Sequence, residues 1–315
     1  MYRLDAALKA LMDRAKELGY LTYQAVDEYL PDEGGDPLLV DRIVQSLEEL
    51  DIPLINDPSA PRTVAEKTRL EQQLNGEETA PVDAARVLME PETPMSSRDP
   101  IRMYLSQMGN IPLLSREDEI FLAKQIEITR KRFRRTIMES DFALTIAFDI
   151  LQKVHTGELP FERTLRTSDT ENTHKDQILG RMPDNLKTLQ VLMDDSRRDF
   201  QALQETNSRK ERTEIKRRML IRRRKMCILA EELSVRTHRL QPVYKRMQQV
   251  GERLTELERD LTRLKKRGGN ANDIKALQAE LDELVSMTLE TPEEFRARRR
   301  EIKDRSDAWT HATQQ

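Results

Sequence analysis

Apolar residues recur at alternating steps of three and four along most of the chain, the spacing that places side chains on one face of an α-helix. The clearest case is a pair of such series on either side of "KRGGNAND", residues 266–273. The pattern predicts an antiparallel coiled-coil hairpin over residues 240–289, with the glycines at its tip. The first series is Val243, Met247, Val250, Leu254, Leu257, Leu261 and Leu264, and the second is Ile274, Leu277, Leu281 and Leu284.

Residues 1–57 show the same spacing in shorter pieces, which predicts a small domain of three helices. Gly19 stands where the first helix ends, and Thr22 can cap a short second helix that ends at Pro31. The extended segment "DIPLIND" then adds apolar cover. The apolar faces of the first and third helices are Leu4, Leu8, Leu11, Ala15 and Leu18, and Val40, Ile43, Leu47 and Leu50.

Residues 58–96 have the composition of a linker. Five prolines punctuate a polar run with few large apolar side chains, so the segment lacks the material for a core of its own. We therefore predict a mobile tether, with one helical turn around residues 82–89.

The stretch "DPIRMYLSQMGNIPLLSREDEIFLAKQIE", residues 99–127, is sharply punctuated. Asp99 can cap a helix whose first residue is Pro100, and Ser115 with Asp118 three residues later predicts a capping box for a second helix. Two capped helices joined by a short loop are typical of helical hairpins that only pack and also of DNA-binding units. The apolar face of the second helix is Leu122, Ile126, Phe133 and Ile137.

Residues 131–240 are rich in helical sequence, with loops expected at "HTGELP" and "RTSDTENTH". The run "KRRMLIRRRKM", residues 216–226, is strongly basic and contains no aromatic residue that could stack on a base. A role in binding phosphates is possible, but a solvated helix face balanced by nearby glutamates is the preferred interpretation.

Composition supports a helical, elongated protein. Of the 315 residues, 35% are charged and 4% are aromatic, and the mean hydropathy is −0.72, which leaves little material for two compact cores. The net charge of −3 hides an uneven distribution, because residues 1–57 carry −8 and the remainder +5. Such a field acts on nucleic acid or on a basic groove, although a solvated acidic surface is an equally good interpretation of composition alone.

The sequence offers little for catalysis. Its four histidines are far apart and lack the cysteine or carboxylate partners that a metal requires, and there is no phosphate-binding glycine loop. The single cysteine, Cys227, has no histidine nearby, so a packed thiol is favoured over a nucleophile, and the low cysteine content fits a reducing compartment. No apolar run is long enough for a membrane span. We predict no enzyme activity, no cofactor, no metal, no small-molecule substrate, no membrane association and a cytoplasmic location.

The quoted stretch at residues 99–127 resembles the conserved region that opens the DNA-binding core of bacterial primary (housekeeping, sigma-seventy type) sigma factors. The sequences "LKALMDRAKELGYLTYQAVDEYLPDE" and "IVQSLEELDIPLI" are similar to the acidic autoinhibitory domain of the same family. The resemblance implies that core RNA polymerase and promoter DNA are the partners. It further implies that Arg102, Tyr104, Leu105 and Ser106 contact the DNA just downstream of the melted minus-ten element. Ser106 stands where some members carry a basic residue, and the alternative for Tyr104 and Leu105 is that they pack in the seam against the second helix.

The expected fold is all-α. It comprises an acidic helical domain (1–57), a linker (58–96), a promoter-contacting helical region (97–130) and a helical insert (131–315) that includes the hairpin at 240–289. The expected function is that of the N-terminal portion of a sigma factor. We expect the chain to lack the main promoter-melting and upstream-element-reading domains, since aromatic residues are scattered and Trp309 stands alone near the terminus. The alternative is a coiled-coil scaffold or adaptor that carries a DNA-contact unit. The hairpin either braces the insert or presents a surface to the polymerase.

Overall fold

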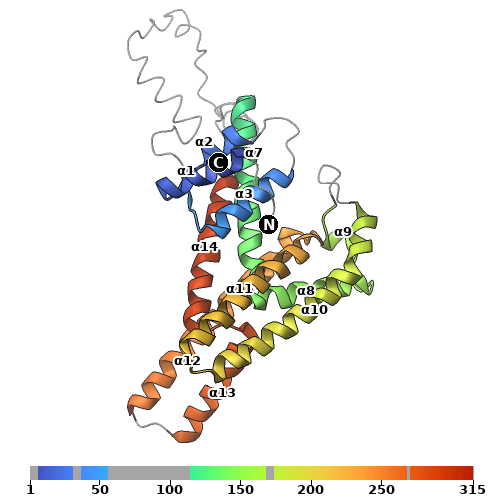
Figure 1. Ribbon diagram of the computed structural model, residues 1–315. Coiled ribbons are helices and arrows are strands. Elements are labelled where there is room, and N and C mark those ends of the chain that lie inside the picture. The colour runs from blue at the N-terminus through green and yellow to red at the C-terminus, as the bar shows by residue number, and fades with distance from the viewer. Residues whose placement is uncertain (1–5, 31–36, 56–113, 168–173, 268–269, 315) are drawn as a thin grey trace, which may run out of the picture. The chain divides into compact units, whose positions relative to one another are not determined.

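The computed structural model of the protein describes residues 6–30, 37–55, 114–167, 174–267 and 270–314 (Figure 1). Within these ranges the fold is all-α, as predicted, apart from two strands of two residues each. The chain divides into two compact units, the first formed by Met1–Gly35 and Gln45–Ile126 and the second by Asp36–Val44 and Glu127–Gln314. Two helices, α3 (Pro37–Glu49) and α7 (Arg116–Met138), have residues in both units.

The first unit contains α1 (Ala6–Leu18), β1 (Leu21–Thr22), α2 (Tyr23–Tyr29) and β2 (Leu54–Ile55). The predicted helix signals are confirmed. Gly19 follows α1 with a φ of +76°, a conformation that glycine adopts without steric cost, and the Thr22 hydroxyl accepts a hydrogen bond from the Ala25 amide at 3.2 Å. Within the "DIPLIND" segment, β2 pairs with β1 in parallel, with Leu21 opposite Leu54.

Two residues of the predicted apolar faces are exposed instead. Leu18 is 52% exposed because α1 ends there and the chain turns at Gly19, while Met12 is buried in its place. Leu50 is 39% exposed because α3 ends one residue before it. Leu4, the linker at 58–96, the one-turn helix at 82–89 and the helix that begins at Pro100 lie outside the described residues.

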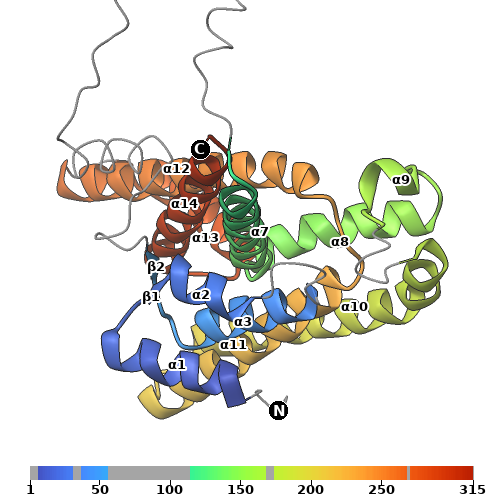
Figure 2. The ribbon, with the colours of Figure 1, turned by 90° about the horizontal axis from the view of Figure 1, so that it is seen from above.

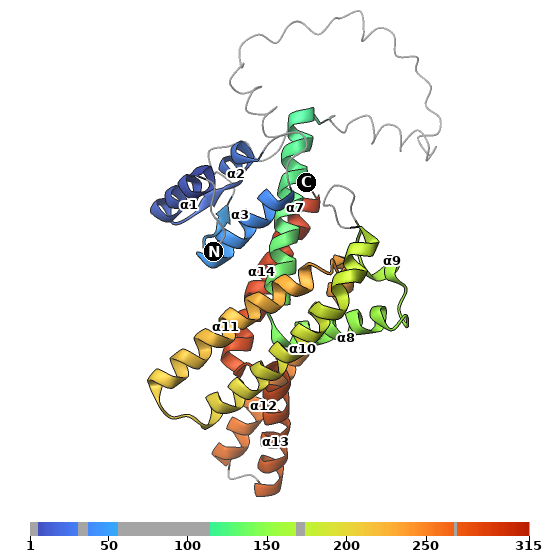
Figure 3. The same cartoon turned by 45° about the vertical axis from the view of Figure 1, so that its right-hand side comes forward.

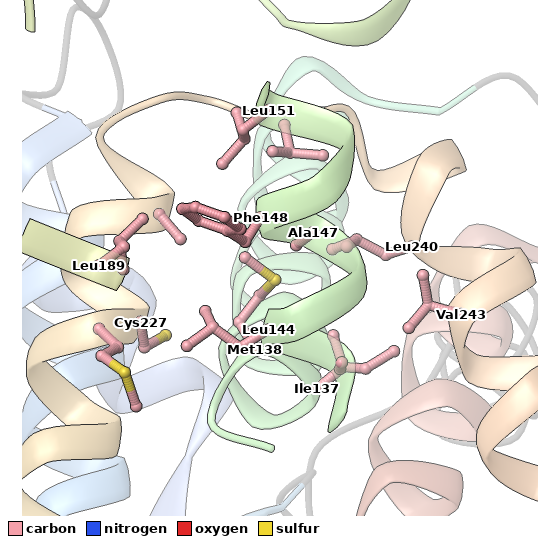
Figure 4. Packing of buried hydrophobic residues seen from close by; sticks show 14 of the residues in the cluster. Ile137, Met138, Leu144, Ala147, Phe148, Leu151, Leu189, Cys227, Leu240 and Val243 are labelled. Atoms are coloured by element: carbon pink, nitrogen blue, oxygen red, sulfur yellow. The ribbon is translucent and has the colours of Figure 1, made fainter. Parts of the chain in front are cut away.

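Helix α8 (Asp141–His155) is the centre of the second unit. It buries side chains along almost its whole length, and the loop after it corresponds to the predicted break at "HTGELP". In Figure 4, Leu144 and Phe148 face Leu189 and Cys227 on one side, while Ala147 faces Leu240 on the other. The surrounding elements are α9 (Phe161–Thr164), α10 (Lys175–Glu205), α11 (Arg209–Glu231), α12 (Thr237–Arg267), α13 (Ala271–Thr288) and α14 (Pro292–Gln314).

Helices α10 and α11 form one long hairpin, and α12 and α13 form the predicted second one (Figure 3). Leu254, Leu257 and Leu261 of the predicted seam are buried, whereas the seam residues of α13 are only partly buried. Arg253 donates to both carboxylate oxygens of Glu280 at 2.7 and 2.8 Å, and these hydrogen bonds lower the pKa of Glu280. The second hairpin therefore has one apolar arm set against a more exposed partner helix.

Four charged residues that are distant in sequence form a buried network in the second unit. The Arg223 guanidinium contacts Asp141 Oδ2 at 2.5 Å and Glu290 Oε1 at 3.3 Å, and Arg298 Nε lies 2.6 Å from the same Glu290 oxygen. Asp141 and Glu290 are almost fully buried. Burial alone would lower the pKa of Arg223, but the two carboxylates outweigh it and raise that pKa. The network fixes the turn between α13 and α14 against α8 and α11.

Trp309, which is isolated in the sequence, packs against aromatic rings of other helices. Its ring stacks on Phe133 with centroids 5.4 Å apart, and Phe133 in turn meets the edge of Tyr244 at 6.1 Å. The three rings come from α14, α7 and α12, and α7 lies beside α14 in Figure 2. The rings belong to the core or pack against it, so in this structure they serve packing and not base stacking.

Candidate nucleic-acid interface

The four predicted DNA-contact residues, Arg102, Tyr104, Leu105 and Ser106, lie outside the described residues. The structure therefore neither brings these side chains together nor separates them. It does describe α7, which begins at Arg116, ten residues after Ser106.

The start of α7 has the predicted cap. The Ser115 hydroxyl accepts a hydrogen bond from the Asp118 amide at 3.2 Å and donates one to Asp118 Oδ2 at 2.6 Å. Glu117 and Glu119 complete an acidic first turn, which interacts favourably with the positive end of the helix dipole. The start of α7 is thus defined by its capping residue, Ser115.

The far end of α7 is anchored in the core of the second unit. Phe133, Ile137 and Met138 are fully or almost fully buried, whereas Leu122 and Ile126 nearer the start are only partly buried. The predicted apolar face is therefore real, but its burial increases along the helix. A helix with one capped end and one packed end is a rigid support for a segment that joins it at the capped end.

Within the first unit, Lys124 of α7 interacts with the end of α2. Its ammonium group lies 2.7 Å from Asp27 Oδ1 and donates to the Leu30 carbonyl at 2.9 Å. The Lys124 side chain is 13% exposed, so this contact is shielded from solvent more than an ordinary surface ion pair is. An acidic residue of the N-terminal segment is thereby paired with a base of the helix that follows the predicted DNA-contact residues.

Four of the seven bases in the run at residues 216–226 pair with protein carboxylates. Arg218 and Arg222 both pair with Asp199, at 2.7 and 2.8 Å, and Lys216 pairs with Glu294 at 2.6 Å. Arg223 belongs to the buried network described above. For these four bases the charge is balanced within the protein, but the partners are aspartates and glutamates distant in the sequence, and Arg222 and Arg223 are largely buried, contrary to the predicted solvated face.

A second basic surface, not recognised in the sequence, lies between α12 and α14. We call it the α12–α14 groove. Its volume is about 800 Å³, and six basic side chains and one acidic side chain line it. The lining residues are Gln248, Thr255, Glu258, Arg259, Thr262, Arg263, Arg296, Arg299, Arg300 and Lys303. The sequence signal was a spacing of three and four among the bases of α14, but nothing in the sequence paired that face with α12.

Cys227 is fully buried, and its Sγ lies 3.8 Å from the Arg135 carbonyl. Burial, reinforced by Glu231, raises the pKa of the thiol well above its ordinary value, so the interpretation of this cysteine as a packed thiol is confirmed. In the described parts of the chain, no group of three histidine, cysteine or acidic side chains is placed to hold a metal. None of the helices described there has the length and apolarity to cross a membrane.

Comparison with known proteins gives two family matches. Residues 4–81 match the model of the sigma-70 factor, region 1.1, and residues 99–131 match that of the sigma-70 factor, region 1.2. The chain is also 30% identical over 162 residues to the "RNA polymerase sigma factor RpoD" of Neisseria gonorrhoeae. That alignment spans 49% of this chain and 24% of the relative, so only about a quarter of the relative's length is represented.

Proposed function

Since the chain carries sigma-70 regions 1.1 and 1.2 and corresponds to the N-terminal portion of a housekeeping sigma-70-type factor, we propose that it binds core RNA polymerase and contacts promoter DNA during transcription initiation in the cytoplasm. The observation that carries the proposal is the region 1.2 match, which covers all four predicted contact residues and runs on into α7.

The chemistry of the four residues supports a DNA contact. Arg102 can neutralise a phosphate, while Tyr104 and Leu105 can pack on an unstacked base. Ser106 can donate or accept a hydrogen bond. The capped start of α7, nine residues after Ser106, gives the segment a rigid point of attachment.

Changing Tyr104 to alanine is expected to weaken promoter complexes. The loss should be about tenfold in affinity, since stacking on one base is worth roughly 1–3 kcal/mol. The measurement is filter binding of promoter DNA by polymerase assembled with a sigma factor that contains this sequence. Lys153→Ala, an exposed change on α8, serves as the control. Equal promoter affinity for Tyr104→Ala and the control would contradict a base contact at this residue.

We further propose that the acidic segment 1–57 restrains DNA binding or occupies the basic DNA channel of the polymerase. Its charge of −8 favours binding to any basic surface nearby. Deleting residues 1–57 should therefore raise the DNA affinity of the free sigma factor several-fold at low salt. The gain should shrink as salt rises, because the charges are exposed and screened.

A milder variant tests whether the charge of residues 1–57, and not merely their presence, lowers DNA affinity. Glu17→Gln, Glu49→Gln and Asp51→Asn together remove three exposed acids and leave the helices in place. This variant should show a smaller gain than the deletion, in the same direction and with the same salt dependence. A gain on deletion that is absent in the neutralised variant and insensitive to salt would show that the charge of the segment is not the cause.

A further inference from the structure

The α12–α14 groove is built by two helices that run in opposite directions. Gln248 meets Arg299, and Glu258, farther along α12, meets Arg296, earlier in α14. Gly251 makes the close approach possible, because a methyl group at this position would overlap the Arg299 side chain. The groove is therefore a consequence of helix packing and exists before any ligand binds.

Three of the groove's arginines interact with protein groups, and one of them, Arg263, lies 3.6 Å from Asp260 Oδ1. Arg296 pairs with Glu258 at 2.5 Å, and Arg299 donates to Gln248 Oε1 at 2.9 and 2.6 Å. Three further bases, Arg259, Arg300 and Lys303, are exposed, and none has an ion-pair partner among the residues that the structure describes.

We propose that the α12–α14 groove binds the phosphate backbone of duplex DNA, through Arg259, Arg300 and Lys303. Of the described residues that line it, six are basic, one is acidic and that acid is already paired. Arg300 and Lys303 lie three residues apart on α14, about 4.5 Å along the helix axis, and Arg259 lies on the facing helix α12. The three unpaired bases can therefore each reach a different phosphate.

The character of the groove favours a duplex over other anions. None of the described lining residues is aromatic, so the groove offers no platform for the unpaired bases of a single strand. Its volume of about 800 Å³ exceeds what one small inorganic anion fills. Contacts of this kind fix the position of a protein on DNA but read no sequence.

This inference rests on the proposed function only for the choice of DNA as the ligand, since the groove lies outside both family matches. It gives the helical insert a task that the sequence left open. The α12–α14 pair would hold the flanking duplex, while residues 102–106 contact the promoter at a different point.

The test compares two triple variants of the full chain in binding a fluorescently labelled duplex of arbitrary sequence. Arg259→Gln, Arg300→Gln and Lys303→Gln remove the unpaired bases of the groove. Lys153→Gln, Arg181→Gln and Lys187→Gln remove the same charge from exposed positions on α8 and α10 that have no ion-pair partner among the described residues. Fluorescence anisotropy is measured between about 50 and about 200 mM salt, the range in which counterion release changes affinity strongly.

The groove variant should bind about tenfold more weakly at about 50 mM salt and show a salt slope lower by up to roughly 2.7, or 0.9 for each lost phosphate contact. The control should change little. Equal losses in both variants would mean a diffuse field, and no loss in either would mean no contact; both results overturn the proposal. Unchanged DNA binding with weaker binding to core polymerase would identify a protein-docking surface and overturn it as well.

Thermal unfolding followed by circular dichroism checks that both variants fold, and Lys303→Glu alone provides a second groove variant that disturbs a single exposed position. The two proposals fail separately. If the groove variant binds duplex DNA normally while Tyr104→Ala weakens the promoter complex, only the groove proposal is contradicted. If the groove variant binds more weakly while Tyr104→Ala has no effect, only the contact at residues 102–106 is contradicted.

Discussion

Replacing Leu257 by aspartate is expected to lower the free energy of unfolding of the second unit by roughly 5 kcal/mol, the largest single effect expected here. Leu257 is fully buried on the α12 side of the hairpin. The change removes a leucine side chain from a packed site and places an unpaired carboxylate there, so a cavity and a buried charge both contribute. Urea unfolding measures the loss, and hydrogen exchange of α12 and α13 locates it.

The matched control is Gln249→Asp, which adds the same charge to an exposed position of the same helix. Its effect should stay within about 0.5 kcal/mol, as for most surface substitutions. If Leu257→Asp is no more harmful than Gln249→Asp, the seam of the hairpin does not carry the stability that its burial implies.

Arg223→Met is expected to cost about 3–5 kcal/mol, the usual loss when one partner is removed from a buried ion pair. The carboxylates of Asp141 and Glu290 would remain buried, with only Arg298 to balance them. The measurement is again urea unfolding, followed by circular dichroism. The turn between α13 and α14 should become the fastest-exchanging part of the second unit in hydrogen exchange.

Two companion variants make this result specific to the buried network. Lys216 is on the same helix as Arg223 and pairs with Glu294 of α14, and both partners are more than 40% exposed. Lys216→Met removes this ion pair and should cost at most about 1 kcal/mol. Combining Arg223→Met with Asp141→Asn should cost less than Arg223→Met alone, because one uncompensated charge is gone. If the double variant is less stable than Arg223→Met alone, packing and not charge balance sets the cost.

Local signals in the sequence predicted much of the fold. Ser115 with Asp118, Thr22 and Gly19 mark helix ends through groups only a few residues apart, and all three appear as expected. The seam of α12 is a repeat along one helix, so spacing alone locates it. In both cases the interactions that fix the structure lie within one turn or along one helix face.

The features that sequence reasoning missed depend on which helices become neighbours. Arg223 was part of an apparently solvated basic run, yet it meets Asp141, which lies 82 residues away. The six bases of the α12–α14 groove come from two helices whose sequences give no sign of pairing. Long-range packing of this kind leaves no periodic signal, so neither the network nor the groove could be inferred before the fold was known.

The stack of Trp309 on Phe133 gives the protein an optical reporter. Trp309 is the only tryptophan in the sequence, and its indole N–H is buried with no hydrogen-bond partner among the described residues, so its emission should lie at short wavelength. Phe133 belongs to α7, the helix that follows the proposed DNA contact. Any partner or substitution that lifts α7 from α14 would hydrate the indole and shift its emission to the red. Intrinsic fluorescence can therefore follow the docking of α7 in real time, without a label.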